Sequence, residues 1–401
     1  MLNIHGRSIL HMDLDAFFVS VECLRDNRLK GKPLIIGGKS DRGVVAACSY
    51  ETRHFGVHSA MPMKLALQLC PDAIVISGDA EAYSMYSKMV TDIIRERAPL
   101  FEKSSIDEFY LDLTGMDRFF GCYKWSTELR KAIMSETHLP ISMGLSINKL
   151  VSKVATGESK PNGQRRVEEG SEQDFLAPLS IRKIPMIGKK TSDFFYEMGI
   201  TKVRTLREMP VRMLEATFGK NGRIIWNKAH GIDNSPVIPY VERKSISTES
   251  TFETDSIDIK KMKAILTAMV EKLAFQLRSE KKLCACITVK IRYSDFETTS
   301  KQVHIGYTSS DKILIDKAMA LFDALYTRRM LIRLVGVRLS KLVHGNYQIN
   351  LFEDTQEEIN LFEATDWIKN KYGAAAVMRA STVDTSSRVR HNFNAFSGLI
   401  S

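Results

Sequence analysis

An apolar stretch that contains two adjacent acids constrains the fold of this chain more than any other feature. The stretch KSSIDEFYLDL, residues 103–113, has the apolar residues of a β-strand, yet Asp107 and Glu108 lie side by side within it. Successive side chains of a strand point to opposite faces, so we expect the two carboxylates to face different surroundings. Two like charges about 4 Å apart repel by roughly 4 kcal/mol at an effective dielectric constant near 20. A divalent cation that prefers oxygen ligands, such as Mg²⁺, would relieve that repulsion.

A third acid is expected at the same place. Residues 7–16 form a short apolar run that predicts a buried strand, and Asp13 lies near its end, followed by Leu14 with its backbone carbonyl. If this strand pairs with the one that carries Asp107 and Glu108, three carboxylates converge at one rim of a sheet. Such a set suits a two-metal site for phosphoryl transfer, with ions about 3.5–4 Å apart. The alternative is that these acids are simply solvated at strand ends.

Strands and helices alternate around these acids. The residue pattern predicts strands at 32–38, 43–51, 105–113 and 141–147, and helices at 17–25, 79–97, 123–136 and 148–157. Such alternation is typical of an α/β or α+β core. Over 184–235 the pattern changes to short helices broken by turns. The stretch 235–247 contains two prolines and predicts an extended linker.

Beyond the linker, the pattern predicts a second α+β domain with a basic surface. Expected elements are helices at 261–280 and 311–327 and strands at 285–293 and 332–342. Residues 240–345 contain 19 Lys and Arg against 12 Asp and Glu, a net charge of +7. Within 285–293 the apolar Ile287, Val289 and Ile291 alternate with Lys290 and Arg292. A sheet with an apolar back and a basic front could follow the phosphates of a nucleic acid; the alternative is a merely solvated face.

The composition excludes several classes of protein. Its 401 residues, 44% hydrophobic and 26% charged, are typical of a soluble globular chain of several domains, and its net charge of +10 suits a polyanionic partner. The amino-terminal segment lacks a signal-peptide core, and no stretch approaches 18 consecutive apolar residues, so we expect no membrane span. The six scattered cysteines predict packed thiols in a reducing compartment, and we expect a cytoplasmic protein.

Five ordered motifs resemble those of Y-family DNA polymerases, and within that family those of the bacterial DNA polymerase IV branch. The motifs are MDLDAFFVSVE (12–22), SYETRHFGV (49–57), SIDEFYLDLTG (105–115), GLSINKLVSKVA (144–155) and KPNGQ (160–164). The resemblance runs from about residue 7 to residue 345. It implies a template-directed DNA polymerase of the translesion type, with low fidelity and no proofreading exonuclease, which acts in DNA damage tolerance.

The resemblance also implies a multidomain α+β architecture. Residues 1–165 would form a palm with a mixed or antiparallel sheet together with small fingers, the fingers at about 19–77. A helical thumb would follow over 166–234 and a linker over 235–244. An α+β little finger would span 245–345, followed by a tail over 346–401. Within the thumb, IPMIGKK (184–190) resembles a helix-hairpin-helix, whose turn would bind a DNA phosphate. Met186 stands there in place of the usual first glycine.

The three acids match the catalytic positions of the family. Asp13 and Asp107 match its metal carboxylates, and Glu108 matches the acid usually assigned as catalytic. Together with the carbonyl of Leu14, they are expected to hold two Mg²⁺ ions. The metal would activate the primer 3′-hydroxyl and neutralise charge on the reacting phosphates of the deoxynucleoside triphosphate.

Four other residues match positions that contact the incoming nucleotide, namely Phe18, Tyr50, Arg53 and Lys160. Phe18 matches the steric gate, an aromatic ring that leaves no space for a 2′-hydroxyl, whereas Phe17 is expected in the core; the alternative places both rings in the core. Tyr50 and Arg53 share a helix face, from which Arg53 could bond phosphate oxygens. Lys160 is expected to reach the triphosphate, although on its residues alone it is a surface lysine in a turn.

The carboxy-terminal tail suggests a protein partner. Residues 346–401 contain 5 Lys and Arg against 7 Asp and Glu, so the tail is acidic on a basic protein. Within NYQINLFED, the side chains of Gln348, Leu351 and Phe352 resemble the peptide with which bacterial polymerases bind the sliding clamp. Exposed apolar residues outside a core act well as partner anchors.

A near copy of this peptide, EINLFEA, follows in residues 358–364, with Glu358 in place of the glutamine. We expect this copy to be structural, as part of a helix that packs Leu361, Phe362 and Trp367 on the little finger. The expected partners are therefore primer–template DNA and the sliding clamp, with the polymerase itself a monomer.

Two other classes of protein share some of these features. A polymerase-like DNA-binding accessory without catalysis should lack one of the three acids Asp13, Asp107 and Glu108, and all three are present. A nucleotide cyclase could share a palm-like core with paired metal acids. The basic 240–345 segment and the hairpin-like stretch 184–190 argue against a cyclase.

Overall fold

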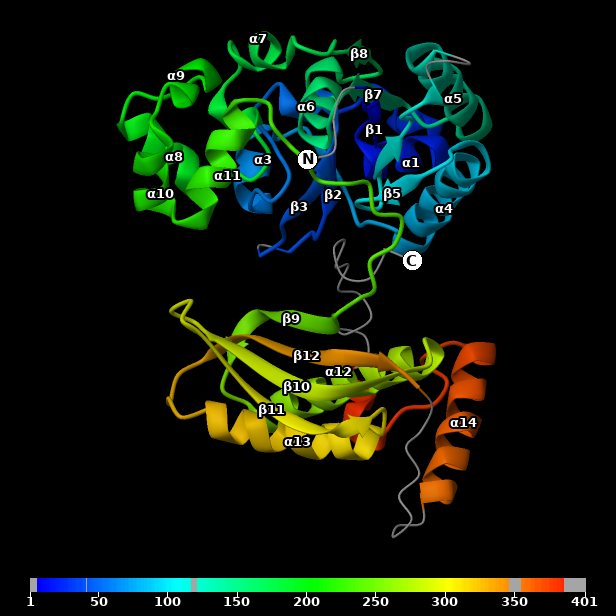
Figure 1. Ribbon diagram of the computed structural model, residues 1–401. Coiled ribbons are helices and arrows are strands. Elements are labelled where there is room, and N and C mark those ends of the chain that lie inside the picture. Colours follow the sequence, from blue (N-terminus) through cyan, green and yellow to red (C-terminus); the bar gives the residue numbers. More distant parts are fainter. Residues whose placement is uncertain (1–5, 41, 117–120, 346–354, 386–401) are drawn as a thin grey trace. The chain divides into compact units, whose positions relative to one another are not determined.

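The computed structural model describes residues 6–40, 42–116, 121–345 and 355–385 (Figure 1). The chain forms two compact units, one up to Val241 and one from Glu242 onward. Both units mix helices with sheets, so the predicted multidomain α+β fold class is confirmed. The unit boundary lies within the stretch 235–244.

A five-stranded mixed sheet lies at the centre of the first unit. The strand order is β5-β6-β1-β7-β8, with bounds Phe101–Lys103, Glu108–Asp112, Ile9–Leu14, Ile141–Ser146 and Gln164–Arg166. β1 runs antiparallel to both β6 and β7, whereas β7 and β8 are parallel. The strands predicted at 7–16, 105–113 and 141–147 are confirmed with shorter bounds.

Helices cover both faces of this sheet, which explains why every residue of β7 is buried (Figure 1). Their bounds are Phe17–Arg25 for α1, Ala80–Arg97 for α4, Cys122–Thr137 for α5 and Lys149–Ser159 for α6. α6 approaches β7 closely at Gly144, where a Cβ atom would lie 2.3 Å from the carbonyl oxygen of Ser152. This approach brings Lys153 of α6 to Glu108 at the start of β6.

A smaller, three-stranded sheet has the order β3-β2-β4, with bounds Val45–Cys48, Leu34–Gly37 and Ile74–Ile76. The predicted strand 43–51 ends early because the Ser49 side chain accepts a hydrogen bond from the backbone N–H of Thr52 and caps α2, Tyr50–Arg53. Strand β4 and helix α3, Met63–Leu69, are not expected from the sequence. β4 has only three residues, none of them fully buried, so its apolar signal is weak.

Short helices around a separate apolar cluster complete the first unit. They are α7 (Glu172–Leu176), α8 (Lys189–Glu197), α9 (Val203–Arg207), α10 (Val211–Phe218) and α11 (Lys220–Ala229). Phe195, Leu206 and Leu214 are buried in this cluster. In the turn before α8, the exposed Met186 has a φ of 79°. This left-handed conformation favours glycine, so the turn keeps a glycine-like backbone without a glycine.

The second unit is a four-stranded antiparallel sheet with two helices, α12 and α13, packed on one face (Figure 1). The strand order is β11-β10-β12-β9, with bounds Thr298–Thr308, Lys282–Tyr293, Ile332–His344 and Ser245–Ser256; α12 spans Ile259–Ser279 and α13 spans Asp311–Leu325. The predicted alternation in β10 is confirmed, since Ile287, Val289 and Ile291 are buried in the core. On the other face, Lys290 pairs with Glu249 at 2.6 Å, which lowers the net positive charge there.

A further helix, α14 (Thr355–Tyr372), packs on the rest of the second unit. Phe362 is only 7% exposed, which confirms that this part of the second peptide copy is structural, but Leu361 and Trp367 are each 59% exposed. The expectation that Leu361 and Trp367 also pack is therefore wrong. Arg278 of α12 holds α14 in place: its guanidinium bonds Asp366 at 2.6 Å and lies 4.9 Å from the centre of the Phe362 ring.

Replacing Arg278 with alanine is expected to destabilise the second unit by about 3–5 kcal/mol. The buried guanidinium also pairs with Asp311 at 2.7 Å, so its loss leaves two largely buried carboxylates, Asp311 and Asp366, without a countercharge. Denaturant-induced unfolding of the whole chain measures the change. The matched control is Arg379→Ala, whose partly exposed pair with Glu271 should contribute less than about 1 kcal/mol. Equal losses in the two variants would contradict the proposed anchoring role of Arg278.

Candidate active site

The three acids expected to form a site do come together. β1 and β6 pair with Asp13 directly opposite Glu108, so their side chains leave the sheet on the same face, with Cβ atoms about 5 Å apart. Asp107 lies one residue before β6, and its carbonyl accepts a hydrogen bond from Leu14 N–H at 3.0 Å. The predicted pairing of these two strands is confirmed. The expectation that Asp107 and Glu108 alternate as strand neighbours is wrong, because the strand begins only at Glu108.

The local backbone before β6 directs the Asp107 carboxylate. The Ser105 hydroxyl donates to Asp107 Oδ1 at 2.5 Å, and the backbone N–H groups of Asp107 and Glu108 point back to Ser105 Oγ at 3.3 and 3.0 Å. Ser105 thus closes a small turn directly before the strand begins at Glu108. That turn, rather than the strand pleat, decides where the Asp107 carboxylate lies.

Burial makes ionisation of Asp13 and Asp107 unfavourable. Desolvation raises the pKa of Asp13 to about 7; the charge of Lys160 opposes this rise, and the charges of Asp107 and Glu108 add to it. Burial likewise raises the pKa of Asp107, with Glu108 contributing further. Clustered carboxylate oxygens are the donor set that Mg²⁺ prefers. The residues present therefore fit a divalent cation.

Two lysines now supply positive charge to the acids. Lys160 Nζ donates a hydrogen bond to Asp13 Oδ1, and Lys153 Nζ lies 2.5 Å from Glu108 Oε1. Within the described ranges, no group of three or more His, Cys, Asp or Glu side chains is arranged as a metal site. Each of the two amines pairs with one carboxylate of the cluster.

Lys153 is not among the residues expected from the sequence to belong to the site. Its signal is its position one helical turn after Lys149 in the motif GLSINKLVSKVA, which places both amines on one face of α6. Lys149 bonds both carboxylate oxygens of Glu102 at 2.7 Å. Only the packing of α6 on the sheet shows that Lys153 instead meets Glu108.

His11 also borders the site without a predicted role. Its Nδ1 lies 2.8 Å from Thr156 Oγ1, and its Nε2 lies 4.0 Å from Glu108 Oε1 with no hydrogen-bond partner among the described residues. Burial lowers the pKa of His11 well below its usual value, and the charges of nearby lysines lower it further. The ring is therefore neutral, and it contributes no positive charge to the acids.

Asp15 has a structural role next to the site. Its buried carboxylate accepts hydrogen bonds from Ser142 Oγ at 2.8 and 2.9 Å and from Asn162 N–H at 2.7 Å. Asn162 belongs to the Pro-Asn-Gly turn directly after Lys160. Asp15 thereby fixes the turn that presents Lys160 to Asp13.

Phe17 and Phe18 open α1, directly after β1. Both rings are buried, as expected for Phe17. The Phe18 ring stacks on Tyr83 of α4 with 4.4 Å between ring centres and 15° between ring planes. Tyr83 is not anticipated from the sequence, although it lies in the helix predicted at 79–97. The stack holds Phe18 at the start of α1, five residues beyond Asp13.

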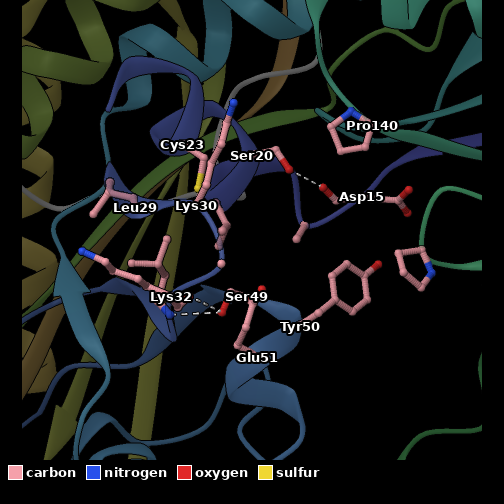
Figure 2. Close-up of a pocket in the computed structure, with 15 residues that line it drawn as sticks. Asp15, Ser20, Cys23, Leu29, Lys30, Lys32, Ser49, Tyr50, Glu51 and Pro140 are labelled. Atoms are coloured by element: carbon pink, nitrogen blue, oxygen red, sulfur yellow. Dashed lines mark hydrogen bonds between the residues drawn. The ribbon is translucent and has the colours of Figure 1, made fainter. Parts of the chain in front are cut away.

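A pocket of about 230 Å³ lies between α1, the segment 29–32 and α2, and Tyr50 and Asp15 form part of its wall (Figure 2). The Tyr50 hydroxyl points toward Asp15 and has no hydrogen-bond partner among the described residues (Figure 2). Burial, followed by the charge of Asp15, raises the pKa of Tyr50 to about 12, so the hydroxyl stays protonated and can donate. The Arg53 guanidinium lies 4.6 Å from the centre of the Tyr50 ring, so the expected pair shares one face.

Three other predictions concern the carboxy-terminal tail, the cysteines and membrane spans. Gln348, Leu351 and Phe352, the expected clamp-binding residues, lie outside the described residues. No disulfide joins the six cysteines, all of which the structure describes, and five of them are buried, as expected for packed thiols. None of the helices in the described ranges is long and apolar enough to cross a membrane.

Comparison with known proteins places this geometry in a family. Residues 12–157 match the model of the impB/mucB/samB family, and residues 243–351 match its C-terminal domain. The chain is 38% identical over 380 residues to a DNA polymerase IV of Dehalococcoides mccartyi strain CBDB1, a match that covers 94% of this chain and 97% of the relative. It is 39% identical over 346 residues to a DNA polymerase IV of Staphylococcus aureus strain Newman, covering 85% and 97% of the two chains.

Solved structures give the same assignment. A Y-family DNA polymerase chimera is similar with a TM-score of 0.76 and 27% identity, over 84% of this chain and all of the chimera. DinB from Sulfolobus solfataricus is similar with a TM-score of 0.58 and 27% identity over the same shares. The family's polymerases use divalent metal ions and deoxynucleoside triphosphates on primer–template DNA, and the three acids Asp13, Asp107 and Glu108 lie in the first matched segment. The chain therefore belongs to the Y family of DNA polymerases and is a DNA-directed DNA polymerase of the translesion type.

Proposed function

We propose that this polymerase adds deoxynucleotides to a primer 3′ end by two-metal phosphoryl transfer, with low fidelity and without a proofreading exonuclease. The observation that carries the proposal is the pairing of β1 with β6, which brings the carboxylates of Asp13 and Glu108 together beside Asp107. Asp13, Asp107, Glu108 and the carbonyl of Leu14 would hold two Mg²⁺ ions. Bound there, the ions supply Lewis-acid activation of the 3′-hydroxyl and charge neutralisation at the phosphates.

The lysines next to the acids fit a role in binding the triphosphate. An ammonium group beside Asp13 can bind either that carboxylate or a phosphate oxygen, because both are anionic acceptors within its reach. Lys160 therefore serves as the palm-side contact to the triphosphate. Lys153, paired with Glu108, supplies a second positive charge next to the acids.

The residues of α2 complete the nucleotide contacts. The Tyr50 hydroxyl is a protonated donor without a partner among the described residues, and such a buried donor favours a ligand acceptor. Arg53, held over the Tyr50 ring, offers charge-assisted bonds to phosphate oxygens. Phe18 is the steric gate, because its stacked ring gives the sugar a rigid flat neighbour.

The remaining parts are assigned to DNA binding. The palm and fingers span 1–165 (fingers about 19–77), the thumb spans 166–234 and the little finger spans 245–345, joined by the linker 235–244. The turn before α8 acts as a helix-hairpin-helix that binds a DNA phosphate through backbone N–H groups, which its glycine-like φ of 79° at Met186 supports. The enzyme works as a monomer in the cytoplasm.

Primer extension tests the proposal. The full chain is incubated with Mg²⁺, the four deoxynucleotides and a labelled primer on an undamaged template. We expect template-directed extension, no extension with a chelator present, and no shortening of the primer when deoxynucleotides are left out. Absence of extension on the undamaged template would overturn the proposed chemistry, and primer shortening would overturn the absence of an exonuclease.

Changing Leu351 and Phe352 together to alanine is expected to remove stimulation by the sliding clamp while sparing basal synthesis. The reason is that apolar anchors contribute most of the affinity of such short peptides. Primer extension with and without the clamp measures the effect. Leu361→Ala is the matched control: it changes the equivalent position of the second copy, whose Phe362 is buried and cannot bind a partner. Equal stimulation of the double variant and the parent would refute the clamp peptide.

A further inference from the structure

One face of α1 contacts both ends of a single tyrosine. Phe18 and Glu22 are four residues apart on this helix, so their side chains lie on the same face. The Phe18 ring stacks on the Tyr83 ring at 4.4 Å, and the Tyr83 hydroxyl donates a hydrogen bond to Glu22 Oε1 at 2.6 Å. Two side chains of α1, one turn apart, thus hold the ring and the hydroxyl of Tyr83.

The glutamate in this arrangement is buried, and its placement therefore needs an explanation. Glu22 is 7% exposed and Tyr83 is fully buried. A buried carboxylate is unfavourable unless it is paired and hydrogen-bonded. The Arg25 guanidinium supplies a countercharge 3.4 Å from the Glu22 carboxylate, and it also pairs with the Asp79 carboxylate at 2.9 Å. The Tyr83 hydroxyl is nearer to Glu22 than Arg25 is, and it therefore sets the carboxylate's position most directly.

The backbone of Tyr83 is held as firmly as its hydroxyl. Asp79 caps α4, accepting hydrogen bonds from the N–H groups of Glu81 and Ala82 at 3.1 and 3.0 Å. Tyr83 N–H donates to the Asp79 carbonyl at 3.1 Å, in the first turn of the same helix. The ring lies between these two anchors, which fix the position of its long axis from the backbone to the hydroxyl. Phe18, stacked on it, is held by the same constraint.

We propose that Glu22 is a positioning residue for the discrimination between deoxynucleotides and ribonucleotides. Through its hydrogen bond with the Tyr83 hydroxyl, Glu22 sets the position of the Tyr83 ring, against which Phe18 packs. The Tyr83 ring in turn fixes how far the Phe18 ring reaches under the incoming sugar. The inference rests on the proposed role of Phe18 as the steric gate. A 2′-hydroxyl adds a single oxygen to the sugar, so exclusion depends on ring position. Misplacement of about 1 Å can change the rate of an enzyme reaction by about 100-fold.

The test measures, for the full chain, the efficiency of ribonucleotide incorporation relative to deoxynucleotide incorporation. Tyr83→Phe removes only the hydroxyl, Glu22→Leu removes the acceptor at similar volume, and Glu22→Gln keeps an acceptor oxygen. We expect the first two variants to raise the ratio about tenfold, roughly the effect of one lost hydrogen bond. Glu22→Gln should stay near the parent. Glu22→Leu combined with Tyr83→Phe should do no more than the larger single change, because both act through one contact.

Glu172→Leu is the matched control, because it removes another buried carboxylate. The two oxygens of Glu172 accept hydrogen bonds from Gly170 N–H at 3.0 and 3.1 Å, in the turn before α7. It should lower stability without changing the ratio. An unchanged ratio in Tyr83→Phe, or additive effects in the double variant, would overturn the inference. If Glu22→Leu fails to fold, Tyr83→Phe still tests the inference, because this variant loses the hydroxyl but keeps the ring on which Phe18 stacks.

Phe18→Ala separates this inference from the proposed gate. If Phe18→Ala raises the ratio but Tyr83→Phe does not, the gate stands and the role of Glu22 falls. If Phe18→Ala itself leaves the ratio unchanged, the gate is wrong, and the role of Glu22 falls with it. When the gate stands, Glu22→Leu should have no further effect in the Phe18→Ala background, because the ring that it positions is absent.

Discussion

Replacing Asp107 or Glu108 with alanine is expected to abolish primer extension, a loss of more than about 1,000-fold, while DNA affinity changes by less than about twofold. Each carboxylate is a proposed metal ligand at the point where negative charge develops on the phosphates, so its loss removes stabilisation of the transition state. DNA affinity depends instead on phosphate contacts spread over other parts of the chain. Single-turnover nucleotide incorporation and fluorescence anisotropy with labelled primer–template measure the two effects separately.

Asp112→Ala is the matched control for these variants. Asp112 ends the same strand, β6, and its carboxylate accepts a hydrogen bond from Thr114 N–H at 3.0 Å, away from the other acids. We expect this variant to keep parental turnover. Turnover retained in both Asp107→Ala and Glu108→Ala would show that the acids are not the catalytic metal ligands.

Replacing Phe18 with alanine is expected to raise ribonucleotide incorporation relative to deoxynucleotide incorporation by about 100-fold. The ring is the proposed obstacle to the 2′-hydroxyl, and an apolar site without a steric block discriminates only weakly against one added hydroxyl. Steady-state incorporation of a matched ribonucleotide and deoxynucleotide opposite the same template base gives the ratio. The deoxynucleotide reaction itself should be affected much less, because the metal acids remain in place.

Phe17→Ala distinguishes loss of packing from loss of the gate. Phe17 is buried next to Phe18, with 5.5 Å between ring centres, so its removal should destabilise the first unit without admitting ribonucleotides. A ratio that rises in Phe17→Ala but not in Phe18→Ala would move the gate to Phe17. A ratio that rises in neither variant would exclude both rings.

Local sequence patterns account for the main elements and for the meeting of the three acids. The short apolar runs around Asp13 and Glu108 indicate strands, and the pairing of these strands places Asp13 opposite Glu108. The alternation of Ile287, Val289 and Ile291 with charged residues likewise encodes one buried face of β10. Apolar runs and alternation depend only on residues close together in the chain, so they can be recognised in a single sequence.

Elements with weak local patterns are missed or misplaced. β4 has three half-buried or exposed residues, and no period can be read from so short a run. The Asp107 carboxylate is placed by hydrogen bonds to Ser105, which a strand pattern does not include. In α14, the apolar Leu361 and Trp367 look like core residues in the sequence, yet the packing of that helix buries Phe362 instead.

The sequence alone thus determines the two α+β units, the strands that carry Asp13 and Glu108 and the aromatic residue that follows β1. Only the tertiary structure decides which cations meet the acids and what lies against Phe18. Lys153 is 45 residues from Glu108, and Tyr83 is 61 residues from Glu22. Contacts across such separations depend on how helices pack on the sheet, and helical periodicity specifies the face of a helix but not its partner.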